Sequence, residues 1–173
     1  MAGFIDIACN FTHESFKDNL DEVILNAELQ GVEKFVLLCA SLDDLDLIQI
    51  IRNKSPKKFF TSAGIHPHHA NEVLEINHTN LLHKLSKIKP NAIGETGLDY
   101  FRNISPSVQR KSFEMHIEIA KELGLPLYLH QRDSHKDFIR IIKENKDNFP
   151  KFIVHCFTGT QKELDDYLEL GAY

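Results

Sequence analysis

Short apolar runs alternate with amphipathic stretches along the whole chain. Six runs are continuous and apolar enough to be strands that are covered on both faces of a parallel sheet. They span residues 4–8, 34–39, 59–64, 92–94, 126–130 and 152–156. Glu95 follows the fourth run directly. The pattern therefore predicts six buried strands, the fourth of which ends on a carboxylate.

The stretches between the strands have helical periodicity and recognisable helix ends. Gly31 is a C-cap for the first helix, and Ser105-Pro106 supplies the cap and first-turn proline of the third. The five predicted helices span residues 14–30, a stretch after Ser41, 106–123, 134–146 and 161–170.

This alternation of strands and helices is typical of a parallel α/β sheet or barrel. Six units can form an open doubly wound sheet, and they fall short of the eight units and about 250 residues of a complete TIM barrel. The last residues, Gly171-Ala172-Tyr173, resemble the start of a further strand. We predict a single domain over residues 1–173, an α/β fold of the (β/α)8 TIM-barrel type that is incomplete at its C-terminal side.

Glutamate and histidine recur at the ends of successive predicted strands. Glu95, His130 and His155 follow or end the fourth, fifth and sixth strands, while His66 and His68 follow the third. Because the carboxyl ends of parallel strands meet at one edge of the sheet, these side chains should converge. Imidazole and carboxylate are ligands for divalent ions. We predict that Glu95, His130 and His155 bind metal; a structural ion pair between Glu95 and Arg102 is the alternative.

Charge and composition narrow the possible functions. The formal net charge is −5, and no basic tail or stripe points to general nucleic-acid binding. The first ten residues, MAGFIDIACN, lack the basic region of a signal peptide, and no stretch has the length of a membrane span. Three widely spaced cysteines fit reduced thiols. We expect a cytoplasmic monomer with no membrane association.

Four motifs give the chain a specific resemblance. TSAGIHPHHA, AIGETGLDYFRN, LPLYLHQRDSHKDF and KFIVHCFTGT resemble successive motifs of the TatD family of metal-dependent deoxyribonucleases. The resemblance extends from Phe4 to the last residue. It implies a TIM-barrel hydrolase with divalent Mg, Mn or Zn ions, which cleaves phosphodiester bonds in single-stranded DNA or at 3′ ends, as a 3′–5′ exonuclease in DNA repair or turnover.

The resemblance also implies roles for particular residues. Glu95, His130 and His155 match the family's metal-binding residues, and Glu95 is also the expected catalytic residue. His66 and His68 match its Gly-x-His-Pro-His motif, which we place at the phosphates. Arg132 is expected to bind phosphate as well, with pairing to Asp133 or Asp99 as its alternative role. Tyr100 and Phe101 are either stacking surfaces for a base or packing residues.

Two family features are missing from the sequence. Many members have a His-x-His pair on the first strand, where this chain has Ala8 and Asn10. The family's last strand carries a metal-site aspartate that has no counterpart here. Two other functions remain open: an amidohydrolase that acts on a small cyclic amide or nucleobase, and a catalytically silent chain that serves as a binding partner.

Overall fold

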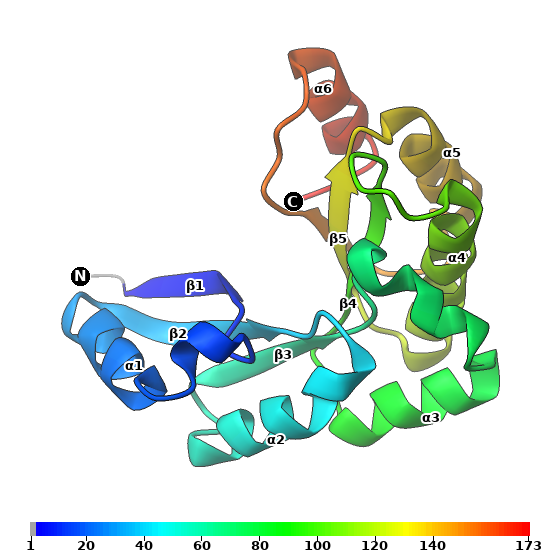
Figure 1. Cartoon of the computed structure of the whole chain (residues 1–173). Helices are drawn as coiled ribbons and strands as arrows, with labels where there is room; N and C mark the ends of the chain where they lie inside the picture. The colour runs from blue at the N-terminus through cyan, green and yellow to red at the C-terminus, as the bar shows by residue number, and fades with distance from the viewer. Residues whose placement is uncertain (1–2) are drawn as a thin grey trace.

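Six parallel strands form one sheet in the order in which they occur along the chain (Figure 1). The computed structural model describes residues 3–173. The strands are β1 (Phe4–Cys9), β2 (Val32–Leu38), β3 (Phe59–Ala63), β4 (Ala92–Asp99), β5 (Leu127–Arg132) and β6 (Phe152–Val154). The sheet curls strongly between β3 and β4, so that it resembles part of a barrel wall. This architecture confirms the predicted incomplete TIM barrel.

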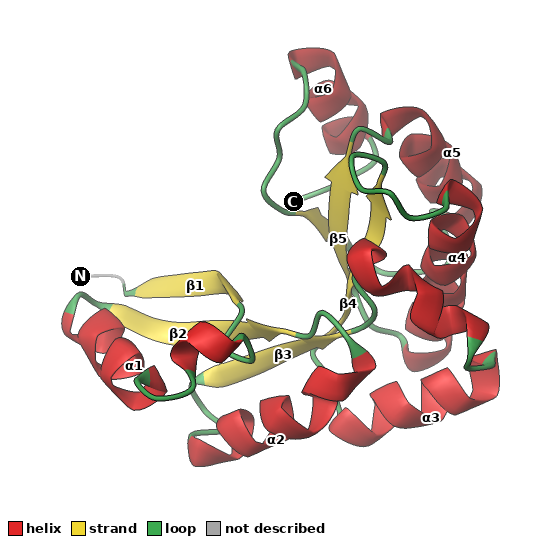
Figure 2. Ribbon diagram, viewed as in Figure 1, coloured by secondary structure: helices red, strands yellow, loops and turns green. Residues whose placement is uncertain are grey.

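Helices alternate with the strands, and most of them lie along the convex side of the curled sheet (Figure 2). The α-helices are α1 (Leu20–Leu29), α2 (Leu45–Lys54), α3 (His78–Ile88), α4 (Pro106–Leu123), α5 (His135–Asn145) and α6 (Gln161–Glu169). Three 3-10 segments precede α1, α2 and α3: η1 (Glu14–Phe16), η2 (Leu42–Asp44) and η3 (Pro67–Leu74).

Two helix predictions need correction. The predicted helix over residues 14–30 is divided into η1 and α1, which begins after the N-cap residue Asn19. The predicted helices include none in the stretch between the third and fourth strands, where η3 and α3 lie. In α3, Leu81, Leu85 and Ile88 form a narrow buried stripe. Polar residues surround this stripe, which explains why the helical period was not recognised.

Strand β4 is longer than predicted and continues past Glu95 to Asp99. Its last residues pair with β5 as far as the partners Asp99 and Arg132, after a register shift between Gly94 and Thr96. Gly94 and Gly97 have φ values of 138° and 136°. A Cβ atom at either position would collide with a carbonyl oxygen of β5. These glycines let β4 stay paired through an irregular segment that an apolar pattern does not predict, so Glu95 lies within the strand and not at its end.

The core lies between the sheet and helices α2 to α5. Each of these helices buries an apolar face, and seven of the eight residues of β4 are buried as well. Strand β1 differs, because only Cys9 of its six residues is buried. Next to β6, the backbone of Tyr173 exchanges hydrogen bonds with Phe152 and Val154. Tyr173 therefore pairs with the edge of β6 through its backbone, and no strand is assigned there within residues 3–173.

Candidate metal centre

Three imidazoles surround one carboxylate oxygen at the carboxyl end of the sheet. Glu95 Oε1 lies 2.5 Å from His155 Nε2, 3.1 Å from His130 Nδ1 and 3.3 Å from His66 Nε2. The Glu95 side chain is only 10% exposed. Among residues 3–173, Glu95 forms no ion pair with a lysine or arginine, so the alternative pairing with Arg102 is wrong.

The parallel strands bring these residues together from distant parts of the sequence. Glu95 lies in β4, His130 lies in β5, and His155 follows the last residue of β6. His66 follows β3 and is the N-cap residue of η3. Pro67 occupies the first turn of η3, where a missing N–H has no cost. The predicted convergence of these four side chains is therefore present.

The environment of Glu95 favours its ionised form. Burial by itself raises the pKa of Glu95, but its contacts with the imidazoles of His130, His155 and His66 outweigh this effect and hold the pKa well below its usual range. A buried carboxylate that stays ionised needs nearby cations or several donors. Imidazole N–H groups such as that of His66 meet part of this need, and imidazole is also a ligand type that divalent zinc or manganese accepts.

His66 is held with one nitrogen fixed as an acceptor. Its Nδ1 accepts the backbone N–H of His68 at 3.1 Å, and a backbone nitrogen can only donate. In a neutral imidazole the other nitrogen, Nε2, then carries the hydrogen and faces Glu95. Burial lowers the pKa of His66, which favours the neutral ring. His66 is therefore a donor at this site, and its Nε2 has no free lone pair for a metal ion.

His130 lies between two carboxylates. Its Nδ1 is 3.1 Å from Glu95 Oε1 and its Nε2 is 3.2 Å from Asp99 Oδ2. A neutral imidazole has one N–H, so it satisfies only one of two ionised carboxylates. A cation between His130 Nδ1 and Glu95 would satisfy the other contact. Glu95, His130 and His155 also lie close enough together to serve as one ligand group. The donor set therefore fits a divalent ion.

Asp99 is a buried carboxylate that was predicted as a possible partner of Arg132 and not as part of the site. Its side chain is 1% exposed, and its Oδ2 lies 2.6 Å from His68 Nε2 and 3.2 Å from His130 Nε2. Burial raises the pKa of Asp99, but its contacts with His68 and His130 outweigh burial and lower it. Because β4 was predicted to end before Asp99, the apolar pattern offered no reason to place this carboxylate beside the histidines.

Arg132 lies outside this cluster. Its guanidinium carbon is 3.9 Å from the centre of the Phe101 ring, and among the described residues it forms no ion pair with Asp133 or Asp99. Phe101 is 58% exposed. Tyr100 is instead tied down, since its hydroxyl donates to Asp137 and accepts from Arg110. Of the two aromatic residues, Phe101 is exposed, with the guanidinium groups of Arg132 and Arg102 over its ring, and Tyr100 holds a structural position.

The first strand contributes no imidazole to the site. Ala8 and Asn10 line the same hollow as Glu95, His66, His68 and His155. Asn10 Oδ1 accepts a hydrogen bond from the hydroxyl of Thr12. The ligand group around Glu95 is therefore supplied by β4, β5 and the segment after β6.

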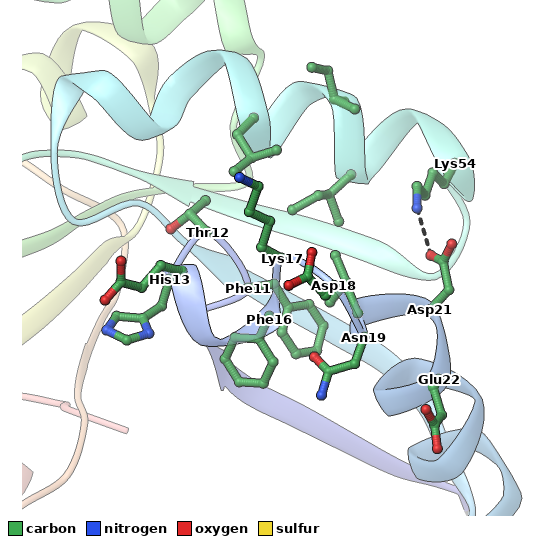
Figure 3. A pocket seen from close by; sticks show the side chains of 15 residues that line it. Phe11, Thr12, His13, Phe16, Lys17, Asp18, Asn19, Asp21, Glu22 and Lys54 are labelled. Carbon is green, nitrogen blue, oxygen red and sulfur yellow. Dashed lines mark hydrogen bonds and ion pairs between the residues drawn. The ribbon is translucent and has the colours of Figure 1, made fainter.

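A larger hollow, of about 610 Å³, lies away from this cluster, between η1, α1 and α2 (Figure 3). Apolar side chains, including Phe11 and Phe16, line it beside acidic and basic residues. Lys54 is held by Asp21 at 2.6 Å. None of the candidate metal-binding groups found within residues 3–173 lies there. The chemistry that the sequence predicts is thus confined to the carboxyl end of the sheet.

A curled parallel α/β sheet with a histidine–carboxylate cluster at its carboxyl end defines a hydrolase-type barrel. Residues 5–173 match the model of the family described as TatD related DNase. The chain belongs to the TatD-related DNase family, as its four motifs predicted.

Curated relatives are about one third identical to this chain over the residues that align. The 3'-5' ssDNA/RNA exonuclease TatD of Musicola paradisiaca is 33% identical over 167 residues, which cover 96% of this chain and 63% of the relative. The protein of the same name from Erwinia billingiae is 34% identical over 167 residues, with coverages of 96% and 64%. The chain therefore spans slightly less than two thirds of these relatives.

Solved structures have the same fold. A hydrolase TatD family protein from Entamoeba histolytica has a TM-score of 0.88 and 31% identity, covering 99% of this chain and 64% of its own. YJJV, a TatD homologue from Escherichia coli, has a TM-score of 0.82 at 24% identity, with coverages of 98% and 66%. The second likeness concerns the fold alone. No helix within residues 3–173 is long and apolar enough to span a membrane.

Proposed function

We propose that this chain carries the catalytic site of a metal-dependent nuclease that hydrolyses phosphodiester bonds in single-stranded DNA from the 3′ end. The observation that carries the proposal is the convergence of His66, His130 and His155 on one oxygen of Glu95. The names of the relatives, which describe 3'-5' ssDNA/RNA exonucleases, support the substrate class and the polarity.

Glu95, His130 and His155 are the residues that would hold a divalent ion. Two imidazoles and a carboxylate suit zinc or manganese, and a magnesium ion would rely more on Glu95 and water. When bound, such an ion lowers the pKa of a water molecule and offsets charge on the phosphoryl oxygens. The side chains of Glu95, His130 and His155 are 10%, 18% and 10% exposed, so most of their surface is packed against the protein.

His66 and His68 are placed to contact the phosphate. The Nε2–H of His66 points into the ligand cluster, where a phosphoryl oxygen can replace Glu95 as its acceptor. His68 is 35% exposed and lines the same hollow, with its Nε2 held by Asp99. Both imidazoles are fixed before substrate binds, which reduces the entropy lost on binding. His66 supplies a local donor to an anionic substrate although the chain has a net charge of −5.

Glu95→Gln tests this proposal, because glutamine keeps the shape of the side chain and removes its charge. With manganese or magnesium and 5′-labelled single-stranded DNA, the unsubstituted chain should release nucleotides from the 3′ end, and a chelator should stop the reaction. Glu95→Gln should lower the rate by more than about 100-fold, since loss of a ligand should exceed the 10–100-fold effect of residues that only orient one.

The matched control is Glu118→Gln, which makes the same change at a side chain that is 67% exposed on α4. Its cleavage rate should not change. Thermal unfolding without metal should show Glu95→Gln to be folded but less stable than the unsubstituted chain, because the imidazole contacts that lower the pKa of Glu95 also stabilise the folded chain. A destabilised Glu95→Gln variant with normal cleavage would contradict the metal-ligand role. Hydrolysis of cyclic amides in place of DNA would contradict the nuclease assignment.

A further inference from the structure

Hydrogen bonds hold both the side chain and the backbone of Asp99 at the end of β4. Its Oδ1 accepts the backbone N–H groups of Phe101 at 3.0 Å and Arg102 at 3.3 Å. The amide group of Gln109 also binds the backbone N–H and carbonyl of Asp99, at 2.7 and 2.8 Å. These contacts hold Oδ1 toward the backbone, so only Oδ2 is free to face the histidines.

Asp99 Oδ2 contacts two imidazoles, in each case at the Nε2 atom. It lies 2.6 Å from Nε2 of His68 and 3.2 Å from Nε2 of His130. A carboxylate oxygen accepts two hydrogen bonds and donates none, so both contacts require an N–H at Nε2. For His130, this assignment leaves the lone pair at Nδ1, which is the atom that faces Glu95.

We infer that Asp99 is a positioning residue that fixes His130 in the tautomer able to bind metal through Nδ1. The same oxygen of Asp99 also hydrogen-bonds to His68 and holds that ring next to the metal centre. The inference rests on the metal centre proposed above. A carboxylate that accepts the second N–H of a metal-binding histidine orients the ring and strengthens it as a ligand. Because His130 and His68 both hydrogen-bond to this oxygen, a displacement of one ring changes the hydrogen bond of the other.

An asparagine in place of Asp99 could not play this part, which makes Asp99→Asn the informative variant. If its oxygen stays on the backbone N–H groups, its NH2 group faces both Nε2 atoms and requires them to accept. His130 would then carry its hydrogen at Nδ1, where the metal should bind. If the amide turns over, its NH2 group meets two backbone N–H donors. The first orientation disfavours the hydrogen at His130 Nε2, and the second loses the two backbone hydrogen bonds. The substitution has these effects with almost no change in the size of the side chain.

Titration calorimetry with manganese on the 173-residue chain measures this effect without any need for activity. Asp99→Asn should bind manganese about 10- to 100-fold more weakly than the unsubstituted chain. Asp137→Asn is the matched control, since it makes the same change in the adjacent contacts with Tyr100 and Arg110 and leaves the histidines untouched. Its manganese affinity should be unchanged.

The possible outcomes separate this inference from the metal centre itself. Absence of manganese binding by the unsubstituted chain would overturn both. Equal affinities of the unsubstituted chain and Asp99→Asn would overturn the positioning role alone. Nitrogen NMR of the metal-free, unsubstituted chain gives a second measurement that needs no foldable variant. The His130 ring should show its hydrogen at Nε2, and a hydrogen at Nδ1 alone would overturn the inference.

Discussion

Strands β1 and β4 both combine isoleucine with acidic residues, yet they lie in opposite environments. In β4, Ile93 is 0% exposed and every residue from Ile93 to Asp99 is buried, because β3 and β5 pair with both edges and α4 packs on the strand. In β1, which among the described strands pairs only with β2, Ile5 is 56% exposed. The position of a strand in the sheet therefore decides whether its apolar residues contribute to stability.

The same difference separates the polar residues of the two strands. Glu95 and Asp99 of β4 are buried, and each is surrounded by imidazoles from neighbouring strands. Asp6 of β1 accepts only the nearby backbone N–H of Ala8 in an exposed setting. A buried charge without partners is energetically costly. A buried carboxylate therefore needs partners at defined positions, whereas an exposed one can be solvated by water. The candidate site consequently lies at β4, β5 and the segment after β6, while Ala8 of β1 and Asn10, just after it, line its wall.

Matched isoleucine substitutions give the largest expected effect that separates the two strands. Ile93→Ala should lower the free energy of unfolding by about 2–5 kcal/mol, because it leaves a cavity in a closed core. Ile5→Ala removes the same atoms from a half-exposed side chain and should cost less than about 1 kcal/mol. Urea unfolding of the 173-residue chain measures both changes. Similar losses in the two variants would show that β1 is covered in solution, for example by a second copy.

The strand order and the outer helices were predictable because β/α alternation leaves few topologies open. The length of β4 was not predictable, since its second half depends on Gly94 and Gly97 lying against carbonyl groups of β5. These close approaches exist only after the sheet has formed. For the same reason Asp99 was not placed at the site, although Glu95, His66, His130 and His155 were correctly predicted to converge.

Arg132 shows a different limit of the sequence. Its position just past a buried strand predicted a charged group near the phosphates, which stays a prediction. The predicted partners Asp133 and Asp99 are not the groups that hold it, because Asp99 is turned toward two histidines and the guanidinium lies over Phe101. Side-chain direction at a strand end depends on the turn that follows, and an apolar pattern does not report that turn.

The second prediction concerns a buried titratable group in the helix that covers β4. Helix α4, which covers β4, carries the fully buried His116, whose Nε2 accepts the backbone N–H of Ile65 at 3.0 Å. Burial lowers the pKa of His116 to about 4, against about 6.5 in an unfolded chain. Its contribution is fully present above about pH 6.5 and is lost as the pH falls toward 4, because the unfolded chain binds the proton more tightly.

Between about pH 7 and pH 4.5, His116 should therefore account for a loss of about 2–3 kcal/mol in the free energy of unfolding. His116→Gln keeps one donor and one acceptor but does not titrate, so urea unfolding should show a flatter pH dependence for this variant. His13→Gln, at an exposed position after β1, is the control and should leave the slope unchanged. A slope unaltered by His116→Gln would mean that His116 is accessible to protons in the folded chain.

The smallest expected effect concerns the phenylalanine that follows each strand. Phe11, two residues after β1, is buried against Phe16 and Phe35, with ring centres 5.5 and 5.9 Å apart. Phe101, two residues after β4, is 58% exposed, with Arg132 over its ring. Only Phe101 therefore has an aromatic surface available to an unpaired base.

Phe101→Leu should weaken single-stranded DNA binding by about 1 kcal/mol, roughly fivefold, because leucine retains apolar area but cannot stack on a base. It should leave stability within about 0.5 kcal/mol, as expected for an exposed residue. Phe11→Leu should do the reverse, lowering stability by up to about 1.5 kcal/mol without changing DNA affinity. Fluorescence anisotropy with labelled oligothymidine, at one fixed salt concentration and with chelator to prevent cleavage, measures the affinities. Equal DNA affinities of Phe101→Leu and the unsubstituted chain would show that Phe101 serves only to support Arg132, and the surface beyond β4 would then act through charge and not through stacking.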